Sequence, residues 1–315
     1  MKEALLGNRK QKAKPEYSTG LGSCYLGKAE DILTSPSISD MEGKIQLILT
    51  SPPFPLNEKK KYGNMQGNDY VEWLSNFAPI FSRLLTDDGS IVMEIGNAWE
   101  KDRPIQSLLP LKTFMKFVEH PDAGLRLCQE FICHNPARLP SPVQWVNVER
   151  SRLTDSYTHI WWMAKSDRPK ADNRKILRPY SKSMQCLLKR GTYNSGKRPS
   201  EHIIGNASFL TNHGGSIMPN VIEIDPIDPN KEPRLPINAF SISNTNSKDY
   251  FHRECRNRDI VPHPARMPLE LADLFIQFLT DKGDVVLDPF AGSNTTGFCA
   301  ERSGRSWVSI EPQRE

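Results

Sequence analysis

Short apolar runs, separated by polar and turn-forming segments, predict the strands of a buried β-sheet. The clearest runs occupy residues 45–50, 90–95, 157–164 and 284–288, and residues 306–310 form a fifth near the C-terminus. Their apolar residues are nearly continuous rather than alternating, which is typical of strands that are covered on both faces. We therefore expect a sheet with a helical layer on each side.

Between these runs, apolar residues recur every three or four positions, a spacing that predicts helices. Residues 69–85 predict one helix, and residues 269–279 predict another that begins after Pro268. Proline is favoured at a helix start because its missing N–H would have no partner there. Strands that alternate with helices predict an α/β fold with a parallel sheet.

Residues 166–239 differ from the rest of the chain. They show no sustained period and are rich in Pro, Gly, Asn, Ser and basic residues. A structureless loop of this length is unusual inside a compact domain. We therefore expect a small inserted domain or an ordered set of loops.

Positive charge is concentrated in the same region. The chain has 41 Lys and Arg against 37 Asp and Glu, yet eleven basic and three acidic residues stand between Lys165 and Asn206. Neutralised phosphates supply much of the affinity for nucleic acids, so this stretch predicts contact with a polyanion. A well-solvated loop region is the alternative on charge alone. The basic residues are Lys165, Arg168, Lys170, Arg174, Lys175, Arg178, Lys182, Lys189, Arg190, Lys197 and Arg198.

The composition argues against a metal-binding protein and against a membrane protein. The six cysteines include no Cys-x-x-Cys pair, so the sequence predicts no metal site and fits reduced thiols. No apolar run approaches the roughly 18 residues that a membrane helix needs, and the basic N-terminus lacks the apolar segment of a secretory signal. We therefore expect a cytoplasmic protein that does not bind membranes.

A loop suited to a cofactor follows the fourth apolar run, with the string Asp-Pro-Phe-Ala-Gly-Ser-Asn-Thr-Thr at residues 288–296. Ligands of open α/β sheets bind where strands end, and Gly292 allows a sharp turn there. The polar residues after it can cap the next helix, whose first amides then face the ligand. Glu311 ends the next run, where an acid can accept the ribose hydroxyls of an adenosine. Alone, this unit also fits a generic dinucleotide-binding fold.

A second loop, Thr-Ser-Pro-Pro-Phe at residues 50–54, follows the first apolar run. The exocyclic amine of a nucleobase is a poor nucleophile, and acceptors aimed at its N–H groups hold and activate it. The Ser51 hydroxyl and the Pro52 carbonyl can be those acceptors, while Pro52 and Pro53 stiffen the loop. Phe54 offers a ring face to the base or to a cationic sulfonium. A bare proline turn is the alternative interpretation.

Together these two loops resemble those of S-adenosylmethionine-dependent DNA amino-methyltransferases. The cofactor loop comes last, as in the circularly permuted β-class, and the resemblance extends from Tyr25 to Glu311. It implies a Rossmann-like sheet with helices on both faces and an inserted DNA target-recognition region. It also implies catalytic roles for Ser51, Pro52, Pro53 and Phe54. The cofactor-binding residues that it implies are Asp288, Pro289, Phe290, Ala291, Gly292, Ser293, Asn294, Thr295, Glu311 and His263.

The chain departs from this family at two positions. Asn294 stands where the loop usually has a second Gly, and Asn is the non-Gly residue best able to adopt positive φ. Lys28 follows Gly27 where relatives often have an Asp that contacts the cofactor adenine. Either Asp31 replaces that acid or other groups contact the ring, so we assign no residue to this contact.

The residue at position 51 bears on which atom is methylated. Relatives that methylate adenine N6 mostly have Asp or Asn there, whereas those that methylate cytosine N4 mostly have Ser, so Ser51 favours cytosine N4. Carbon-5 methylation needs a thiolate, typically from a Pro-Cys pair, and no cysteine here follows a proline. The alternatives are a DNA adenine-N6 enzyme, an RNA or protein amide N-methyltransferase, and a catalytically silent DNA-binding protein.

The resemblance implies a division into four segments and a set of partners. We predict a basic N-terminal extension at 1–19, a catalytic domain in two parts at 20–165 and 240–315, and a recognition region at 166–239. The expected substrate is double-stranded DNA with a short specific site, from which the target base is flipped out. We expect a monomer or homodimer in a prokaryotic cytoplasm, paired in function with a restriction endonuclease but without a stable complex. The recognised sequence cannot be predicted from these residues.

Overall fold

A computed structural model describes most of the chain. The described residues are 13–55, 65–136, 138–205, 207, 209–223, 255–257, 259 and 266–312. His263, one of the predicted cofactor-pocket residues, lies outside them, as do residues 224–239 of the predicted recognition region. No helix in the described part is long and apolar enough to cross a membrane.

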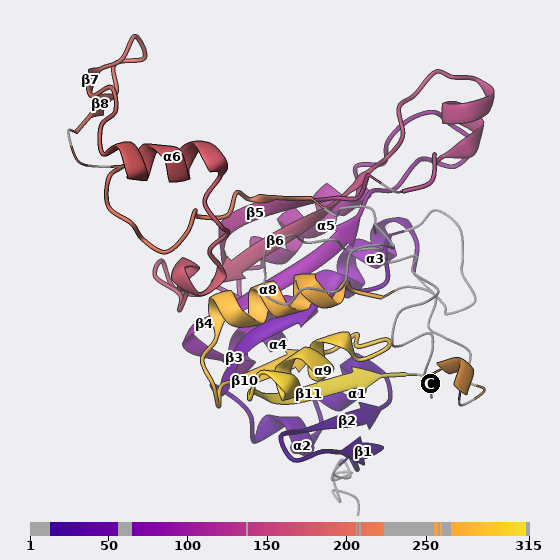
Figure 1. Cartoon of the computed structure of the whole chain (residues 1–315). Coiled ribbons are helices and arrows are strands. Elements are labelled where there is room, and N and C mark those ends of the chain that lie inside the picture. The colour runs from indigo at the N-terminus through magenta and orange to yellow at the C-terminus, as the bar shows by residue number, and fades with distance from the viewer. Residues whose placement is uncertain are drawn as a thin grey trace, which may run out of the picture.

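The described residues form one large sheet with the strand order β1-β2-β11-β10-β3-β4-β6-β5-β9 (Figure 1). Its strands are β1 Tyr17–Ser18, β2 Gly22–Leu26, β3 Ile45–Thr50, β4 Leu85–Gly96, β5 Arg126–His134, β6 Tyr157–Ala164, β9 Val221–Glu223, β10 Val285–Asp288 and β11 Ser306–Glu311. Strands that are distant in the chain lie side by side, since β10 pairs in parallel with both β3 and β11. The predicted permuted order therefore brings the two candidate loops to neighbouring strands.

The sheet is mostly parallel, as predicted, and β6 is an exception among the predicted strands. Strands β2, β11, β10, β3 and β4 are parallel, but β6 pairs antiparallel with both β4 and β5. A parallel connection needs a crossover of a dozen or more residues, usually a helix, whereas β5 and β6 are consecutive antiparallel strands that form a hairpin. The described residues of the hairpin loop, 135–136 and 138–156, contain the short helix η1 Gln144–Val148 and no crossover helix.

Helices cover both faces of the sheet, as predicted, with α8 and α9 in front in Figure 1. One face packs against helices α1 Ala29–Leu33, α2 Pro36–Ser39, α3 Gly67–Ser75, α4 Phe77–Leu84 and α5 Leu109–Val118. The other packs against α8 Leu269–Leu279 and α9 Thr295–Arg302. Two apolar cores, one on each face, explain why the strand sequences are continuously apolar.

The single helix predicted at 69–85 is two helices, α3 and α4, which meet at Asn76. Pro79 is the physical reason. Its ring has no N–H and clashes with the carbonyl four residues earlier, at Ser75, where α3 ends. The apolar period runs through both helices because both pack on the same core.

One edge of the sheet, which we call the carboxyl edge, gathers the ends of β10, β3 and β4. Gly96, the last residue of β4, pairs with Thr158 near the start of β6, and His134 at the end of β5 pairs with Tyr157. The loop between β5 and β6 therefore starts and finishes at the carboxyl edge. The opposite edge holds Ala164 at the end of β6, after which the basic stretch begins.

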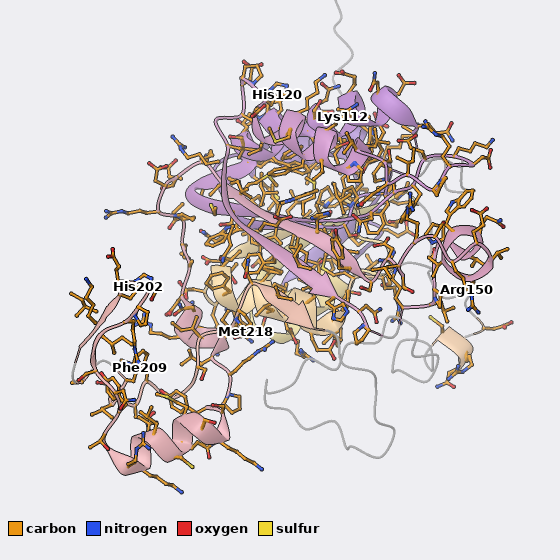
Figure 2. The ribbon with its side chains drawn as sticks, turned by 90° about the horizontal axis from the view of Figure 1, so that it is seen from above. Lys112, His120, Arg150, His202, Phe209 and Met218 are labelled. Atoms are coloured by element: carbon orange, nitrogen blue, oxygen red, sulfur yellow. The ribbon has the colours of Figure 1, made fainter. Side chains whose placement is uncertain are left out.

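Two segments project from this body (Figure 1). The first is the β5–β6 loop, residues 135–156, which contains the short helix η1 Gln144–Val148 and is called the hairpin arm here. The second is the basic arm, residues 178–216, with α6 Lys182–Arg190 and the strand pair β7 Gly196–Lys197 and β8 Ile203–Ile204. Figure 2 shows them on opposite sides of the body, with Arg150 on one and His202 and Phe209 on the other.

Candidate active site

Asp288, at the carboxyl end of β10, connects the two candidate loops. Its Oδ1 accepts a hydrogen bond from the Thr50 hydroxyl at 2.8 Å and from the Phe290 amide at 3.1 Å, and its Oδ2 accepts from the Thr296 hydroxyl at 2.7 Å. Burial raises the pKa of the Asp288 carboxyl to about 6. Both oxygens already have donors, so this residue holds Thr50, directly before Ser51, against the cofactor loop.

Asn294 gives the cofactor loop its shape. It adopts the left-handed conformation with φ 54°, as expected for the residue that replaces Gly. Its Oδ1 accepts from the Gly297 amide at 3.2 Å and the Ser309 hydroxyl at 2.5 Å, and its Nδ2 donates to the Tyr17 hydroxyl at 2.7 Å. Asn294 thereby caps α9 and binds the loop to β11 and β1.

The residues around this loop fit S-adenosylmethionine. Glu311, at the end of β11, accepts a hydrogen bond from the Gly292 amide at 2.9 Å, so a carboxylate lies beside the turn where a ribose would be held. The ring centroids of Phe290 and Trp73 lie 5.5 Å apart. The Trp73 indole N–H donates a hydrogen bond to the Glu30 carboxylate. Of the two acids near Lys28, the half-buried Glu30 rather than the exposed Asp31 is therefore connected through Trp73 to this loop.

The catalytic loop leaves β3 beside the end of β4. Phe54 packs its ring on Gly96, where even a Cβ would approach the ring to 2.6 Å. Pro52 and Pro55 are buried, whereas Ser51 and Phe54 stay half-buried. The loop thus rests on the backbone of β4 and leaves the Ser51 hydroxyl and part of the Phe54 ring at the carboxyl edge.

Glu94, a buried acid in β4 next to Ser51, is not among the site residues predicted from the sequence. Its carboxylate accepts hydrogen bonds from Ser51 and, at 3.0 Å, from the Thr158 hydroxyl. Burial raises the pKa of Glu94, and Arg138 partly offsets this effect. An acid inside an otherwise apolar run was the available signal, because a buried carboxylate is costly unless it has partners.

Further polar side chains hold the base of the hairpin arm at this edge. Asn97 donates to Asp155 at 2.8 Å and accepts from Gln106 at 3.1 Å. Arg138 donates to the Tyr157 carbonyl at 3.1 Å and lies 3.9 Å from the Asp155 carboxylate. These contacts fix the arm relative to Glu94 and Ser51.

The structure places nine of the eleven predicted DNA-binding residues in two groups, and the other two, the exposed Arg168 and the half-buried Arg178, belong to neither. Lys170 and Lys175 form ion pairs with Asp281 and Asp284, which precede β10 at the edge opposite Ser51. Lys165 donates to a backbone carbonyl at the start of β4, and Arg174 pairs with Asp172. We therefore leave these four out of the phosphate contacts proposed for this protein. Those that lie exposed on the basic arm are Lys182, Lys189, Arg190, Lys197 and Arg198.

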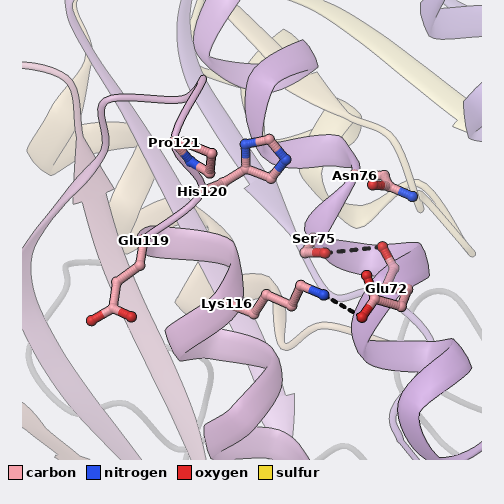
Figure 3. A pocket seen from close by; sticks show the side chains of 7 residues that line it. All are labelled: Glu72, Ser75, Asn76, Lys116, Glu119, His120 and Pro121. Atoms are coloured by element: carbon pink, nitrogen blue, oxygen red, sulfur yellow. Dashed lines mark hydrogen bonds and ion pairs between the residues drawn. The ribbon is translucent and has the colours of Figure 1, made fainter.

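A shallow pocket lies between the C-terminal ends of α3 and α5 (Figure 3). Lys116 and Glu72 form an ion pair across it, and His120 and Pro121 line its far side. Helices α3 and α5 both begin near the carboxyl edge, so their C-terminal ends point away from it. The pocket contains none of the predicted site residues.

Comparisons with known proteins agree with this geometry. The model of the N6/N4 methyltransferase family, described as DNA methylase, matches residues 45–315. Type II methyltransferase M.PvuII from Proteus hauseri is 38% identical over 305 residues, which cover 96% of this chain and 83% of that protein. The solved structure of the cytosine-N4-specific PvuII DNA methyltransferase matches with a TM-score of 0.70 at 32% identity, covering 96% and 85% of the two chains. DNA adenine methyltransferase YhdJ from Escherichia coli K12 is 37% identical over 89 residues, 28% of this chain and 30% of that protein.

Proposed function

The chain belongs to the N6/N4 family of DNA methylases, and we propose that it methylates cytosine N4 within a short duplex site. Family membership confirms the sequence-based prediction of an S-adenosylmethionine-dependent DNA methyltransferase with an α/β fold. The choice of cytosine and the roles of individual residues belong to the proposal.

The hydrogen bond from Ser51 to Glu94 is the observation that carries it. A Ser51 hydroxyl that donates to the buried Glu94 carboxylate keeps the lone pairs of its oxygen available to accept a hydrogen bond from an amine. The Pro52 carbonyl can accept the second N–H, so the nitrogen is held between two acceptors. Such preorganised acceptors favour the pyramidal nitrogen that attacks.

When bound, S-adenosylmethionine supplies an electrophilic methyl group on sulfur. Attack by the amine forms the N–C bond as the C–S bond breaks, and the nitrogen then holds one proton too many. Ser51 can accept that proton as its own passes to Glu94. Burial raises the pKa of Glu94, which suits a carboxylate that must take up a proton.

Two observations favour cytosine over adenine. A neutral hydroxyl stands at position 51, where adenine-specific relatives mostly have an acid or amide. The PvuII enzyme, which resembles this chain across nearly its whole length, is named cytosine-N4-specific, whereas the adenine methyltransferase matches only 28% of the chain. Adenine N6 is the second candidate because the family includes both chemistries.

The proposed substrate is duplex DNA, and the exposed cations of the basic arm are the proposed phosphate contacts. Residues 179–215 carry five Lys or Arg and one Glu. The arm is closed at its base by backbone hydrogen bonds of 2.7 and 2.8 Å between Arg178 and Ser216, and its five Lys and Arg residues between them are exposed. Because the relative is a type II enzyme, we also propose functional pairing with a restriction endonuclease.

Mass analysis of nucleosides from DNA incubated with the protein and labelled S-adenosylmethionine tests the proposal. N4-methylcytosine is the expected product, and N6-methyladenine would refute the choice of base. Ser51→Ala should reduce turnover by about 10²–10³ while the dissociation constant of the cofactor stays constant, because the lost acceptor acts on the amine. A parallel loss of cofactor affinity would contradict this division of roles.

A further inference from the structure

The hairpin arm carries unusually exposed apolar side chains. Leu139, Val143, Val148 and Leu153 are 78%, 58%, 65% and 89% exposed. Single exposed apolar residues are ordinary, but several on one projecting segment mark a contact surface. The segment lies beside the active site described above.

The arm is nevertheless an ordered structure. The Ser151 amide donates to the Trp145 carbonyl at 2.8 Å, and the Asp155 amide donates to the Ser141 carbonyl at 3.2 Å. Arg152 donates from Nε to the Pro104 carbonyl at 2.8 Å, which anchors the arm to the segment after β4. Its apolar side chains are therefore held outward by a defined backbone.

The base of the hairpin arm and Ser51 share one hydrogen-bond partner, the Glu94 carboxylate. Thr158, directly after the arm and Tyr157, donates to the same Glu94 carboxylate that accepts from Ser51. A base that reaches Ser51 remains covalently joined to its strand, so the neighbouring duplex must lie against the carboxyl edge. The arm rises from that edge and is placed to meet it.

The charges of the arm fit a polyanion. Arg150 and Arg152 are exposed near its most exposed leucine. Of its two acids, Asp155 is already engaged by Asn97 and Arg138, and Glu149 accepts from Gln144. DNA-bending proteins combine the same elements, arginines for the backbone and apolar wedges that enter between bases.

We propose that the hairpin arm docks on duplex DNA beside the flipped base, with Leu139, Val148 and Leu153 as its apolar contacts. Flipping a base costs a few kcal/mol of stacking and pairing, and an apolar side chain that enters the disturbed step offsets part of that cost. The inference rests on the proposed function, because it requires a flipped target. It adds a second DNA contact to that of the basic arm.

Leu153→Ser and the double variant Leu139→Ser/Leu153→Ser test this proposal. The matched control is Leu127→Ser, which removes a 45% exposed leucine at the opposite edge of the sheet. The substrate is a duplex carrying the site that sequencing identifies in DNA methylated by the wild type, with 2-aminopurine next to the target. Its fluorescence rises when stacking is lost, whether or not methyl transfer follows.

With the normal duplex, the double variant should lose about tenfold in affinity and most of the fluorescence rise, since a wedge contact offsets unstacking. With a mismatch at the target pair, which lowers the cost of flipping, affinity and turnover should return close to those of the control. Cofactor affinity should be unchanged in all variants.

Three results would overturn the proposal. If the double variant had the affinity and fluorescence rise of the wild type on the normal duplex, the arm would not touch DNA. Equal losses of turnover on normal and mismatched duplexes, with normal fluorescence, would assign the arm to active-site geometry. Sedimentation showing a wild-type dimer that the double variant dissociates would make the surface an interface between copies. A product other than N4-methylcytosine would refute the choice of base while leaving the fluorescence result valid for the base that is flipped.

Discussion

The carboxyl edge and the basic arm differ in how their functional side chains are held. At the carboxyl edge, the buried acids Asp288 and Glu94 each bind hydroxyl groups from two different segments, so the side chains are fixed before any ligand arrives. On the basic arm, α6 has no buried residue, and its order comes from caps and backbone contacts. Chemistry requires preorganised acceptors, whereas contact with phosphates requires charge that stays in solvent.

This difference predicts that substitutions of the buried acids at the carboxyl edge alter rate or cofactor affinity, and that those on the basic arm alter only DNA binding. Beside Ser51→Ala, Glu94→Gln should have the largest effect. The amide can still accept from Ser51, but it takes up no proton, so turnover should fall about a hundredfold. Single-turnover kinetics with saturating DNA would measure it. Thr113→Ser, at a buried threonine of α5 away from the site, is the control; an unchanged rate for Glu94→Gln would remove Glu94 from the mechanism.

Acid should weaken cofactor binding through Asp288. When its carboxyl is protonated, one oxygen becomes a donor, and Thr50 or Thr296 can no longer donate to that oxygen. With a pKa of about 6, cofactor affinity should drop about tenfold between pH 7 and pH 5, measured by calorimetry. Asp288→Asn should make the affinity nearly independent of pH, and an unaltered pH dependence in this variant would contradict the assignment.

The effect of Asp288 on stability has the opposite sign. Its pKa in the folded protein, about 6, lies above the ordinary value of 3.8. Between these values the folded state binds more protons at this site than the unfolded state does. Asp288 therefore favours folding most at low pH, and its contribution declines as the pH rises through about 6. Acid should therefore lower cofactor affinity, but protonation of Asp288 should not lower the free energy of unfolding.

The two regions also differ in how far the sequence predicted them. The strands 45–50 and 157–164 and the helix 269–279 were predicted with the bounds that the structure has, because buried elements leave a regular apolar period. The Asn294 cap was predictable because positive φ restricts the residue type. The role of Glu94 was not, since its partner Thr158 comes from a strand 64 residues away in sequence.

The basic stretch shows the limit of charge counting. A lysine in sequence does not reveal whether an acid from elsewhere will neutralise it, and Lys170 and Lys175 meet Asp281 and Asp284 only after the chain has folded. The hairpin arm was missed for a related reason. Its exposed leucines and valines look like core residues until the structure places them at 58–89% exposure.

Removal of charge from the basic arm should give the smallest effect and separate the two groups of cations. Each phosphate contact contributes about 0.9 to the slope of log K against log salt, so Lys189→Gln/Arg190→Gln should reduce the slope by up to about two. Lys170→Gln, whose charge is already paired with Asp281 and Asp284, should leave the slope unchanged. Fluorescence anisotropy at several salt concentrations would measure both. Equal slopes for both variants would mean that Lys189 and Arg190 do not meet phosphate, and that other residues hold the duplex.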